Sequence, residues 1–165
     1  MWAGDRSRLQ VKGRALSATS ELLRNRSALA MAASPNNDLI LVDFDDRGDA
    51  GRIARVTFNN PEKRNALGLA GKEQFIEAMA ALKHDESLRA LVLTGAGDRS
   101  FVGGTNIAEM ADFDLNQAEA SATKTHRVCD AVRTFPVPVI ARINGYCFGS
   151  GMEIAACADM RVAAD

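Results

Sequence analysis

The stretch VIARINGYCFGSGMEIAA, residues 139–156, runs from a short apolar segment through three glycines and a serine into a second apolar segment holding one acid, Glu153. The first segment is typical of a buried strand and the second of a short helix. Glycine permits positive φ and close approach to the main chain. A helix that begins at such a turn points unpaired N–H groups outward, with a dipole that favours negative charge. The stretch therefore predicts a strand, a glycine loop and a helix whose N-terminus can face a ligand.

The same arrangement occurs earlier, in LVLTGAGDRSFVGGTNIAEM, residues 91–110. Two such turns can direct two N–H donors at one developing oxyanion, and each preorganised donor lowers the barrier by about 3–4 kcal/mol. The alternative is two tight turns without a ligand. The first loop lacks the lysine of a phosphate-binding P-loop, and Ser150 is not at the centre of a G-x-S-x-G motif.

The segments upstream of residue 100 also alternate between strand and helix patterns. DLILVDF (38–44) and RIARVTF (52–58) predict a hairpin or two neighbouring strands. Apolar residues at helical spacing predict an amphipathic helix over 69–83. RALVLTG (89–95) predicts a strand buried on both faces.

Farther along, a longer helix is expected before residue 135. Its buried face is predicted to be Ala118, Ala122, Thr125, Cys129 and Val132. The strand 139–145, the helix that follows and a last strand beginning at Met160 complete the pattern. Alternating strands and helices predict an α/β domain with largely parallel pairing.

Composition limits the classes of protein that this chain can belong to. Its 165 residues suit one domain with a core, and the 47% apolar and 25% charged content is that of a globular protein. The net charge of -1 gives no strong field for nucleic acid or for an acidic membrane surface. No apolar run reaches about eighteen residues, so no membrane-spanning helix is predicted.

Residues 1–37 form a basic, Ser/Ala/Arg-rich leader with six Lys/Arg against two acids, which we expect to be disordered. The leader is either an organelle-targeting segment, which would place the protein in the mitochondrial matrix, or an upstream extension before a true start at Met31. The second alternative predicts a cytoplasmic protein. The domain is expected over residues 38–165.

The three cysteines, Cys129, Cys147 and Cys157, lie in apolar segments and are odd in number, which favours reduced core thiols over a disulfide framework. His126 and Cys129 are three residues apart and could form a Cys–His nucleophile or metal pair, or be ordinary helix residues. No further ligand candidates cluster with them.

Three blocks of the sequence carry a resemblance to a known family: VTFNNPEKRNAL (56–67), RALVLTGAGDRSFVGGTNIAEM (89–110) and INGYCFGSGMEIAACADMRVAAD (143–165). In order and spacing they are similar to the signature blocks of the crotonase (enoyl-CoA hydratase/isomerase) superfamily. The resemblance implies a spiral of ββα units that binds acyl-CoA thioesters. Since the closing strands and helices of that fold have no counterpart here, we expect the N-terminal part of a longer hydratase-like protein, with an uncovered, aggregation-prone last strand.

The resemblance also implies an oxyanion hole made by the main-chain N–H groups of Thr105, after Gly104, and Ser150, after Gly149. The family usually has a small residue followed by Asp at 105–106 and glycine at 150, where this chain has Thr105, Asn106 and Ser150. Only main-chain groups are needed, so the hole can survive. The added β-carbons are expected to crowd the thioester, and Asn106 lacks the charge of Asp.

Glu153 matches the first catalytic glutamate of the hydratase branch, which helps to activate water. Apolar surroundings would raise the pKa of Glu153 toward the range useful for proton transfer. The alternative is a helix N-terminal acid placed for the dipole. The family's second glutamate, about 20 residues farther on, would lie past Asp165, so we expect this chain alone to be inactive or nearly so.

The first block resembles the loop that borders CoA, where Lys63 and Arg64 would contact phosphates or remain solvated. The other residues implied to bind substrate are Ala66, Gly104, Thr105, Asn106, Ile107, Ala108, Gly149 and Ser150.

The predicted reaction is hydration of a trans-2-enoyl-CoA to the 3-hydroxyacyl-CoA, with no cofactor besides the CoA of the substrate. The family implies a homotrimer or hexamer, and neither nucleic acid nor membrane is an expected partner. Alternatives within the superfamily are an isomerase, dehalogenase, thioester hydrolase or decarboxylase. A different class is a non-catalytic acyl-CoA-binding or subunit-interaction protein.

Overall fold

The computed structural model describes residues 38–164. The predicted leader, residues 1–37, lies outside the described residues, so its disorder and the domain boundary at residue 38 stay predictions.

The described chain begins with a β-hairpin. Strands β1 (Ile40–Asp46) and β2 (Arg52–Phe58) pair antiparallel, with Ile40 opposite Phe58, and the short 3-10 helix η1 (Gly48–Ala50) joins them. The predicted hairpin is confirmed.

Three further strands, β3 (Leu88–Gly95), β5 (Val139–Ile143) and β7 (Met160–Ala163), extend the sheet in the order β1-β2-β3-β5-β7 with parallel pairing. A second, two-stranded parallel sheet consists of β4 (Ser100–Val102) and β6 (Tyr146–Cys147). The helices are η2 (Pro61–Lys63), α2 (Leu69–Leu82), α3 (Ile107–Met110), α4 (Leu115–Arg133) and α5 (Ser150–Cys157). The element order repeats as two strands followed by a helix, which confirms the predicted ββα units.

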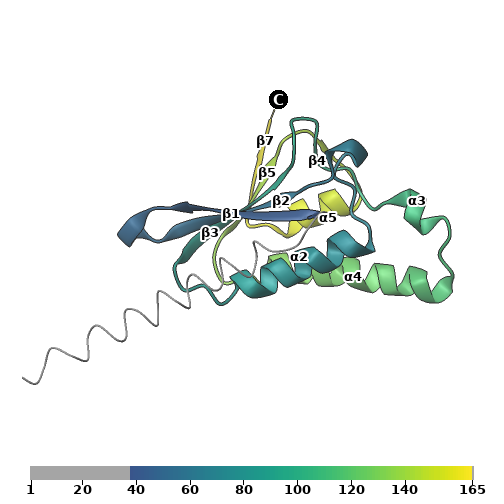
Figure 1. Ribbon diagram of the computed structural model, residues 1–165, viewed down its shortest axis with the longest axis horizontal. Helices are drawn as coiled ribbons and strands as arrows, with labels where there is room; N and C mark the ends of the chain where they lie inside the picture. The colour runs from purple at the N-terminus through teal and green to yellow at the C-terminus, as the bar shows by residue number, and fades with distance from the viewer. Residues whose placement is uncertain (1–37, 165) are drawn as a thin grey trace, which may run out of the picture. The chain divides into compact units, whose positions relative to one another are not determined.

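The core lies between the five-stranded sheet and its helices. Figure 1 shows α2, α4 and α5 on one side of the strands. Phe58 of β2 stacks on Phe75 of α2, with ring centroids 5.3 Å apart, and meets Phe101 edge-on at 5.5 Å. Each such buried side chain contributes about 1.5–3 kcal/mol. This packing fixes the end of β2 and the start of β4, next to which the two glycine loops begin.

One prediction about the opposite face of the sheet is wrong. The strand 89–95 was expected to be buried on both faces, but Arg89 is exposed and Val92 is only part-buried, whereas Leu91 and Leu93 are fully buried. The described helices cover a single face, so burial alternates along the strand. Every residue of β7 is exposed.

The buried face of α4 also differs from the prediction. Ala118 and Ala122 are exposed, and the buried residues are Ser121, Val128 and Val132. The cause is a polar contact: Lys72 of α2 is only 1% exposed, and its Nζ lies 3.1 Å from Ser121 Oγ and 3.3 Å from the Ser121 carbonyl oxygen. Apolar spacing alone does not reveal a buried serine.

Candidate functional site

The two glycine loops lie side by side. Strands β4 and β6 pair with Val102 opposite Cys147, and the Phe148 N–H donates to the Val102 carbonyl oxygen at 3.1 Å. A Cβ built on Gly149 would lie 3.8 Å from the Gly104 Cα, and one built on Gly104 would lie 3.4 Å from the Phe148 carbonyl oxygen. The loops are therefore in contact at the residues directly before Thr105 and Ser150.

Both contact residues need glycine. Gly104 has φ +112 and Gly149 has φ +49, which L side chains rarely adopt. A side chain at either position would also fill the narrow space between the loops. These two conformations turn the chain so that the next residue presents its main-chain N–H.

Within residues 38–164, the N–H groups of Thr105 and Ser150 have no hydrogen-bond acceptor. Leu67 N donates to Gly104 O at 2.9 Å and Asn106 N donates to Leu67 O at 3.2 Å, so the parallel pairing with Leu67 leaves the Thr105 N–H on the other side. Ser150 is the first residue of α5, where an N–H has no intrahelical acceptor. Neither amide donates to an acceptor among residues 38–164.

The predicted apolar surroundings of Glu153 are also wrong, because its side chain is exposed. The residues of α5 that face the core are Ser150, Gly151, Ile154 and Ala155, which turns Glu153 and Met152 outward. The carboxylate stays within electrostatic reach of Lys72 on α2 and Cys129 on α4. It lies one helical turn from Ser150, at the same end of α5.

Two asparagine side chains hold the loops at their beginnings. Asn144 Nδ2 donates to the carbonyl oxygens of Gly95 (2.8 Å) and Gly97 (2.7 Å), and its Oδ1 accepts from Gly95 N at 3.0 Å. Asn65 Nδ2 donates to the carbonyl oxygens of Ser100 (2.8 Å) and Ala96 (3.0 Å). Neither asparagine was predicted to hold a loop. The signal was available, since asparagine near a turn commonly bonds nearby backbone.

Two charged residues beside the loops were also missed. Glu109 of α3 accepts from Leu69 N at 3.1 Å, and so caps α2, which has no side-chain cap of its own. Burial lowers the pKa of Lys72, and the neighbouring Glu109 and Glu153 oppose this shift. The burial of Lys72 was not predicted, because a lysine on a helix is ordinarily solvated.

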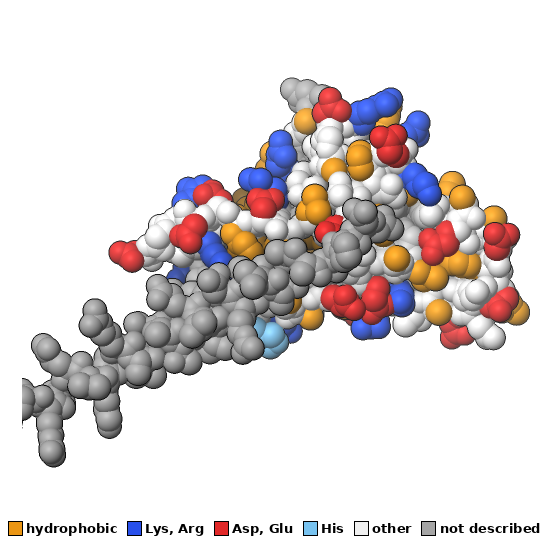
Figure 2. Space-filling view, viewed as in Figure 1, with side chains coloured by type: hydrophobic (Ala, Val, Ile, Leu, Met, Phe, Trp, Pro, Cys, Tyr) orange, Lys and Arg blue, Asp and Glu red, His pale blue; other side chains and the backbone are white. Residues whose placement is uncertain are grey.

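The residues predicted to contact CoA lie around the first loop. Gly103 N donates to Arg64 O at 2.8 Å, so the segment containing Lys63 and Arg64 borders the loop directly. Both of these side chains are exposed, and the Arg64 guanidinium lies 5.6 Å from the Tyr146 ring centroid. Thr105, Asn106 and Ala66 are part-buried, and Ile107 and Ala108 are exposed at the start of α3. Figure 2 shows hydrophobic and acidic side chains side by side over this helix and the start of α4.

The cysteines do not form a nucleophilic or metal site with His126. Burial first, and then the hydrogen-bonded Cys157 thiol, raise the pKa of Cys129 to about 12, whereas His126 is exposed. Burial also raises the pKa of Cys147. Within residues 38–164, no three His, Cys, Asp or Glu side chains are arranged to hold a metal ion. No helix in the same range is long and apolar enough to cross a membrane.

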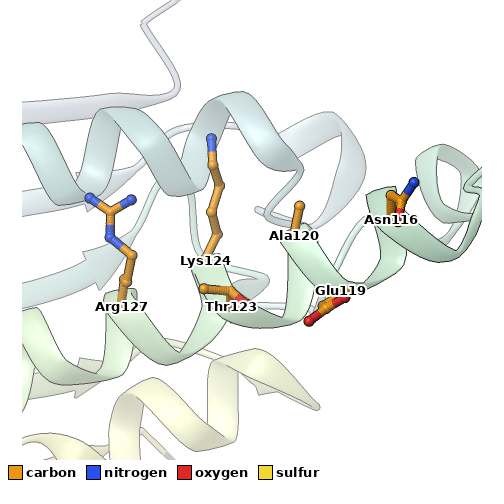
Figure 3. Close-up of a pocket in the computed structure, with 6 residues that line it drawn as sticks. All are labelled: Asn116, Glu119, Ala120, Thr123, Lys124 and Arg127. Carbon is orange, nitrogen blue, oxygen red and sulfur yellow. The ribbon is translucent and has the colours of Figure 1, made fainter.

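An open hollow of about 410 Å³ lies on the outer face of α4, away from the glycine loops. Figure 3 shows Lys124 and Arg127 extending from α4 on the side of α2, and Lys124 pairs with Glu73 of that helix. None of the predicted site residues lines it.

Comparisons with known proteins agree with this arrangement. Residues 48–165 match the family model described as enoyl-CoA hydratase/isomerase. The short-chain-enoyl-CoA hydratase of Clostridium acetobutylicum is 34% identical over 113 residues, which are 68% of this chain and 43% of that protein. Enoyl-CoA hydratase domain-containing protein 2, mitochondrial, of Bos taurus is 31% identical over 68% of this chain and 38% of its own length.

Among solved structures, an enoyl-CoA hydratase of Mycobacterium smegmatis superposes with a TM-score of 0.71 at 34% identity, covering 77% of this chain and 48% of that one. The chain thus spans about half the length of the relatives it matches, and its fold corresponds to part of theirs. The two glycine loops, the ββα repeat and these matches together show that the chain belongs to the enoyl-CoA hydratase/isomerase family, the crotonase superfamily.

Proposed function

We propose that this chain supplies the thioester-binding part of an enzyme that adds water to a trans-2-enoyl-CoA. The observation that carries the proposal is the contact between the loops at Gly104 and Gly149, each followed by an unused main-chain N–H. The N–H groups of Thr105 and Ser150 would bind the thioester carbonyl oxygen. Attack of water at the β-carbon moves electrons onto that oxygen, and each preorganised donor stabilises the resulting charge by about 3–4 kcal/mol.

In this proposal Glu153 accepts a proton from the attacking water. The hydroxyl adds to the β-carbon, the double-bond electrons form the enolate of the thioester, and a proton then adds to the α-carbon on the same face. That last step needs an acid, and this sequence has no glutamate at the family's second position. We therefore expect the chain alone to bind an enoyl-CoA with little or no turnover.

Binding of the CoA portion is assigned to the rim of the first loop. Lys63 and Arg64 are exposed there, and their charges suit the CoA phosphates. Hydration leaves the oxidation state unchanged overall, so the proposed reaction requires no redox cofactor. The trimeric or hexameric assembly and the compartment stay predictions.

The test combines binding and turnover. The chain is titrated with crotonyl-CoA by calorimetry, and hydration is followed by loss of the enoyl-thioester absorbance. Glu153→Gln should leave the Kd within about twofold and lower any hydration rate by about 100-fold or more, because it removes a general base. Glu119→Gln, an exposed change on α4, is the control. An equal, measurable hydration rate in Glu153→Gln and in the unaltered chain rejects the catalytic role, and absence of binding rejects the proposed site.

A second function, acyl-CoA binding without catalysis, is favoured by one observation: Glu153 is exposed. A solvated carboxylate is a weaker base for water activation than one in a dry site. Formation of 3-hydroxybutyryl-CoA from bound crotonyl-CoA would contradict this second function, whereas binding without product is expected of both functions. Formation of a 3-enoyl-CoA from the same substrate would instead indicate an isomerase.

A further inference from the structure

The hydroxyl of Ser150 is an anomaly in the described structure. Ser150 is only 6% exposed, and its Oγ is the one buried side-chain polar atom of residues 38–164 that has no hydrogen-bond partner. Buried polar groups are nearly always paired, so an unpaired one needs an explanation. The buried hydroxyl of Ser100, by contrast, lies 2.8 Å from Arg64 O and 3.0 Å from Tyr146 O.

The position of Ser150 indicates where its partner would lie. It is the first residue of the eight-residue helix α5, and the Cα–Cβ bonds of a helix tilt toward its N-terminus. The Cα–Cβ bond and the N–H of Ser150 are therefore both directed to the end of α5 that follows Gly149, where Gly149 meets Gly104. No hydrogen bond holds the Ser150 side chain in its present rotamer, so rotation about χ1 sacrifices none.

We propose that the Ser150 hydroxyl is a third hydrogen-bond donor to the thioester carbonyl oxygen, beside the N–H groups of Thr105 and Ser150. The inference rests on the proposed function, because it assigns a further donor to the same oxygen. The hydroxyl donates a hydrogen bond and keeps its proton, so no covalent bond is formed or broken. The interaction strengthens as the oxygen becomes an enolate, since hydrogen bonds to charged acceptors are roughly twice as strong as neutral ones.

The unpaired Ser150 hydroxyl also predicts an effect on the stability of the protein without ligand. With no ligand bound, the unpaired hydroxyl opposes folding, because its hydrogen bonds to water are lost on burial and not replaced. Removing it should therefore stabilise the unliganded chain. A serine with a merely structural role would have the opposite effect.

The experiment uses the chain and a 2,4-dienoyl-CoA, whose absorbance moves to longer wavelength when its carbonyl oxygen accepts hydrogen bonds. Ser150→Ala and Ser150→Gly both keep the main-chain N–H and remove the hydroxyl. Both should show a smaller red shift than the unaltered chain and roughly three- to tenfold weaker binding. The melting temperature of free Ser150→Ala should rise by about 2–4 °C. Two variants are used so that a folding defect in one leaves the other to decide, with circular dichroism as the check.

The matched control is Ser87→Ala, which removes a hydroxyl that bonds Asp85 at the other end of β3. Its red shift should equal that of the unaltered chain. A full red shift in both Ser150 variants overturns the third donor and leaves the two-amide hole standing. Binding of the dienoyl-CoA by the unaltered chain with no red shift, or no binding at all, overturns both the third donor and the proposed function. A red shift lost equally in Ser87→Ala, with lowered melting temperatures throughout, assigns Ser150 a structural role and also overturns the proposal.

Discussion

Lys72 is the residue whose environment departs most from what its chemistry favours. Its ammonium is buried between α2 and α4, and no described carboxylate lies within 4 Å of it. The ammonium bonds two oxygens of Ser121, the hydroxyl and the main-chain carbonyl. Glu109 and Glu153 interact with its charge only at longer range. An ammonium so placed costs free energy, which is why burial lowers the pKa of Lys72.

Lys72→Met should remove this cost. The folded-state pKa of Lys72 lies below its ordinary value of 10.5, so the unfolded chain binds more protons in the window just below 10.5. The free energy of unfolding therefore rises with pH in that window, and the rise should be absent in Lys72→Met. At pH 7 the variant should be more stable by about 1 kcal/mol or more. Urea denaturation at neutral and alkaline pH measures both effects.

Lys83→Met, at the exposed end of α2, is the control and should keep the slope of the unaltered chain. Other groups that titrate near this pH are common to all three proteins and cancel in the comparison. Equal slopes in Lys72→Met and the unaltered chain would contradict the assignment of the lowered pKa to this lysine.

Individual residues were the part of the site that sequence predicted least well. Thr105 and Ser150 were assigned through the resemblance of blocks 89–110 and 143–165 to the family's signature blocks, and their roles stay predictions. The surroundings of Glu153 were predicted wrongly, because the apolar composition of 152–157 does not show which side of the helix faces the core. The burial of Lys72 and of Ser121 was not predicted. Each is buried against the other, and the two helices that carry them are far apart in the sequence.

Among the elements, α5 is the one whose position determines the site. Gly151, its second residue, is buried against β4, and a Cβ there would clash with the Val102 carbonyl oxygen. The contact sets the distance of the Ser150 N–H from the first loop. The second residue of the helix is therefore a glycine packed on backbone, at a distance that a residue with a side chain does not allow.

Gly151→Ala should therefore push α5 away from β4. We expect a loss of stability of about 1–3 kcal/mol from the overpacking, and binding of crotonyl-CoA weakened by about tenfold because the two donors no longer converge. Thermal unfolding and calorimetric titration measure the two effects. Gly48→Ala is the control: Gly48, unlike Gly151, has positive φ, and nothing lies within 4 Å of the added Cβ, so the variant should lose stability from strain alone and bind normally. Equal binding by both variants would show that α5 has no such fixed position.

Elements were predicted well where local pattern decides them. The hairpin, α2, β3, β5 and α5 lie where apolar runs, helical spacing and glycine placed them. The errors concern the second face of β3 and the buried stripe of α4, and the short strands β4 and β6 inside the glycine loops were not predicted. A face is set by what packs on it, and the polar contact between Lys72 and Ser121 has no counterpart in a hydrophobic pattern.

For the molecule as a whole, the edge strand β7 is the most exposed part of the main sheet. All four of its residues are exposed, and Met160 and Val162 point to the same face of the sheet. An exposed edge with apolar side chains is a template for association.

Replacing Met160 and Val162 by lysine should suppress association of the chain with itself. The concentration at which half of the chain is associated should increase by at least about tenfold, because each apolar contact removed is worth about 1.5 kcal/mol or more. Light scattering over a concentration series measures it. Leu115→Lys, at an apolar residue that is even more exposed but lies at the start of α4, should leave the midpoint unchanged. A midpoint that moves as much in Leu115→Lys would mean that association does not involve β7.

The asparagine contacts have a consequence for how the domain can diversify. Asn144 joins the ends of β3 and β5, and Asn65 holds the chain that enters β4. The relative position of the Thr105 and Ser150 N–H groups is therefore fixed by residues outside the segment that carries α3 and α4. Residues added or removed in the exposed turn between those helices leave that relative position intact. A lineage can therefore change the length of this segment while the contact between the two glycine loops is inherited unaltered.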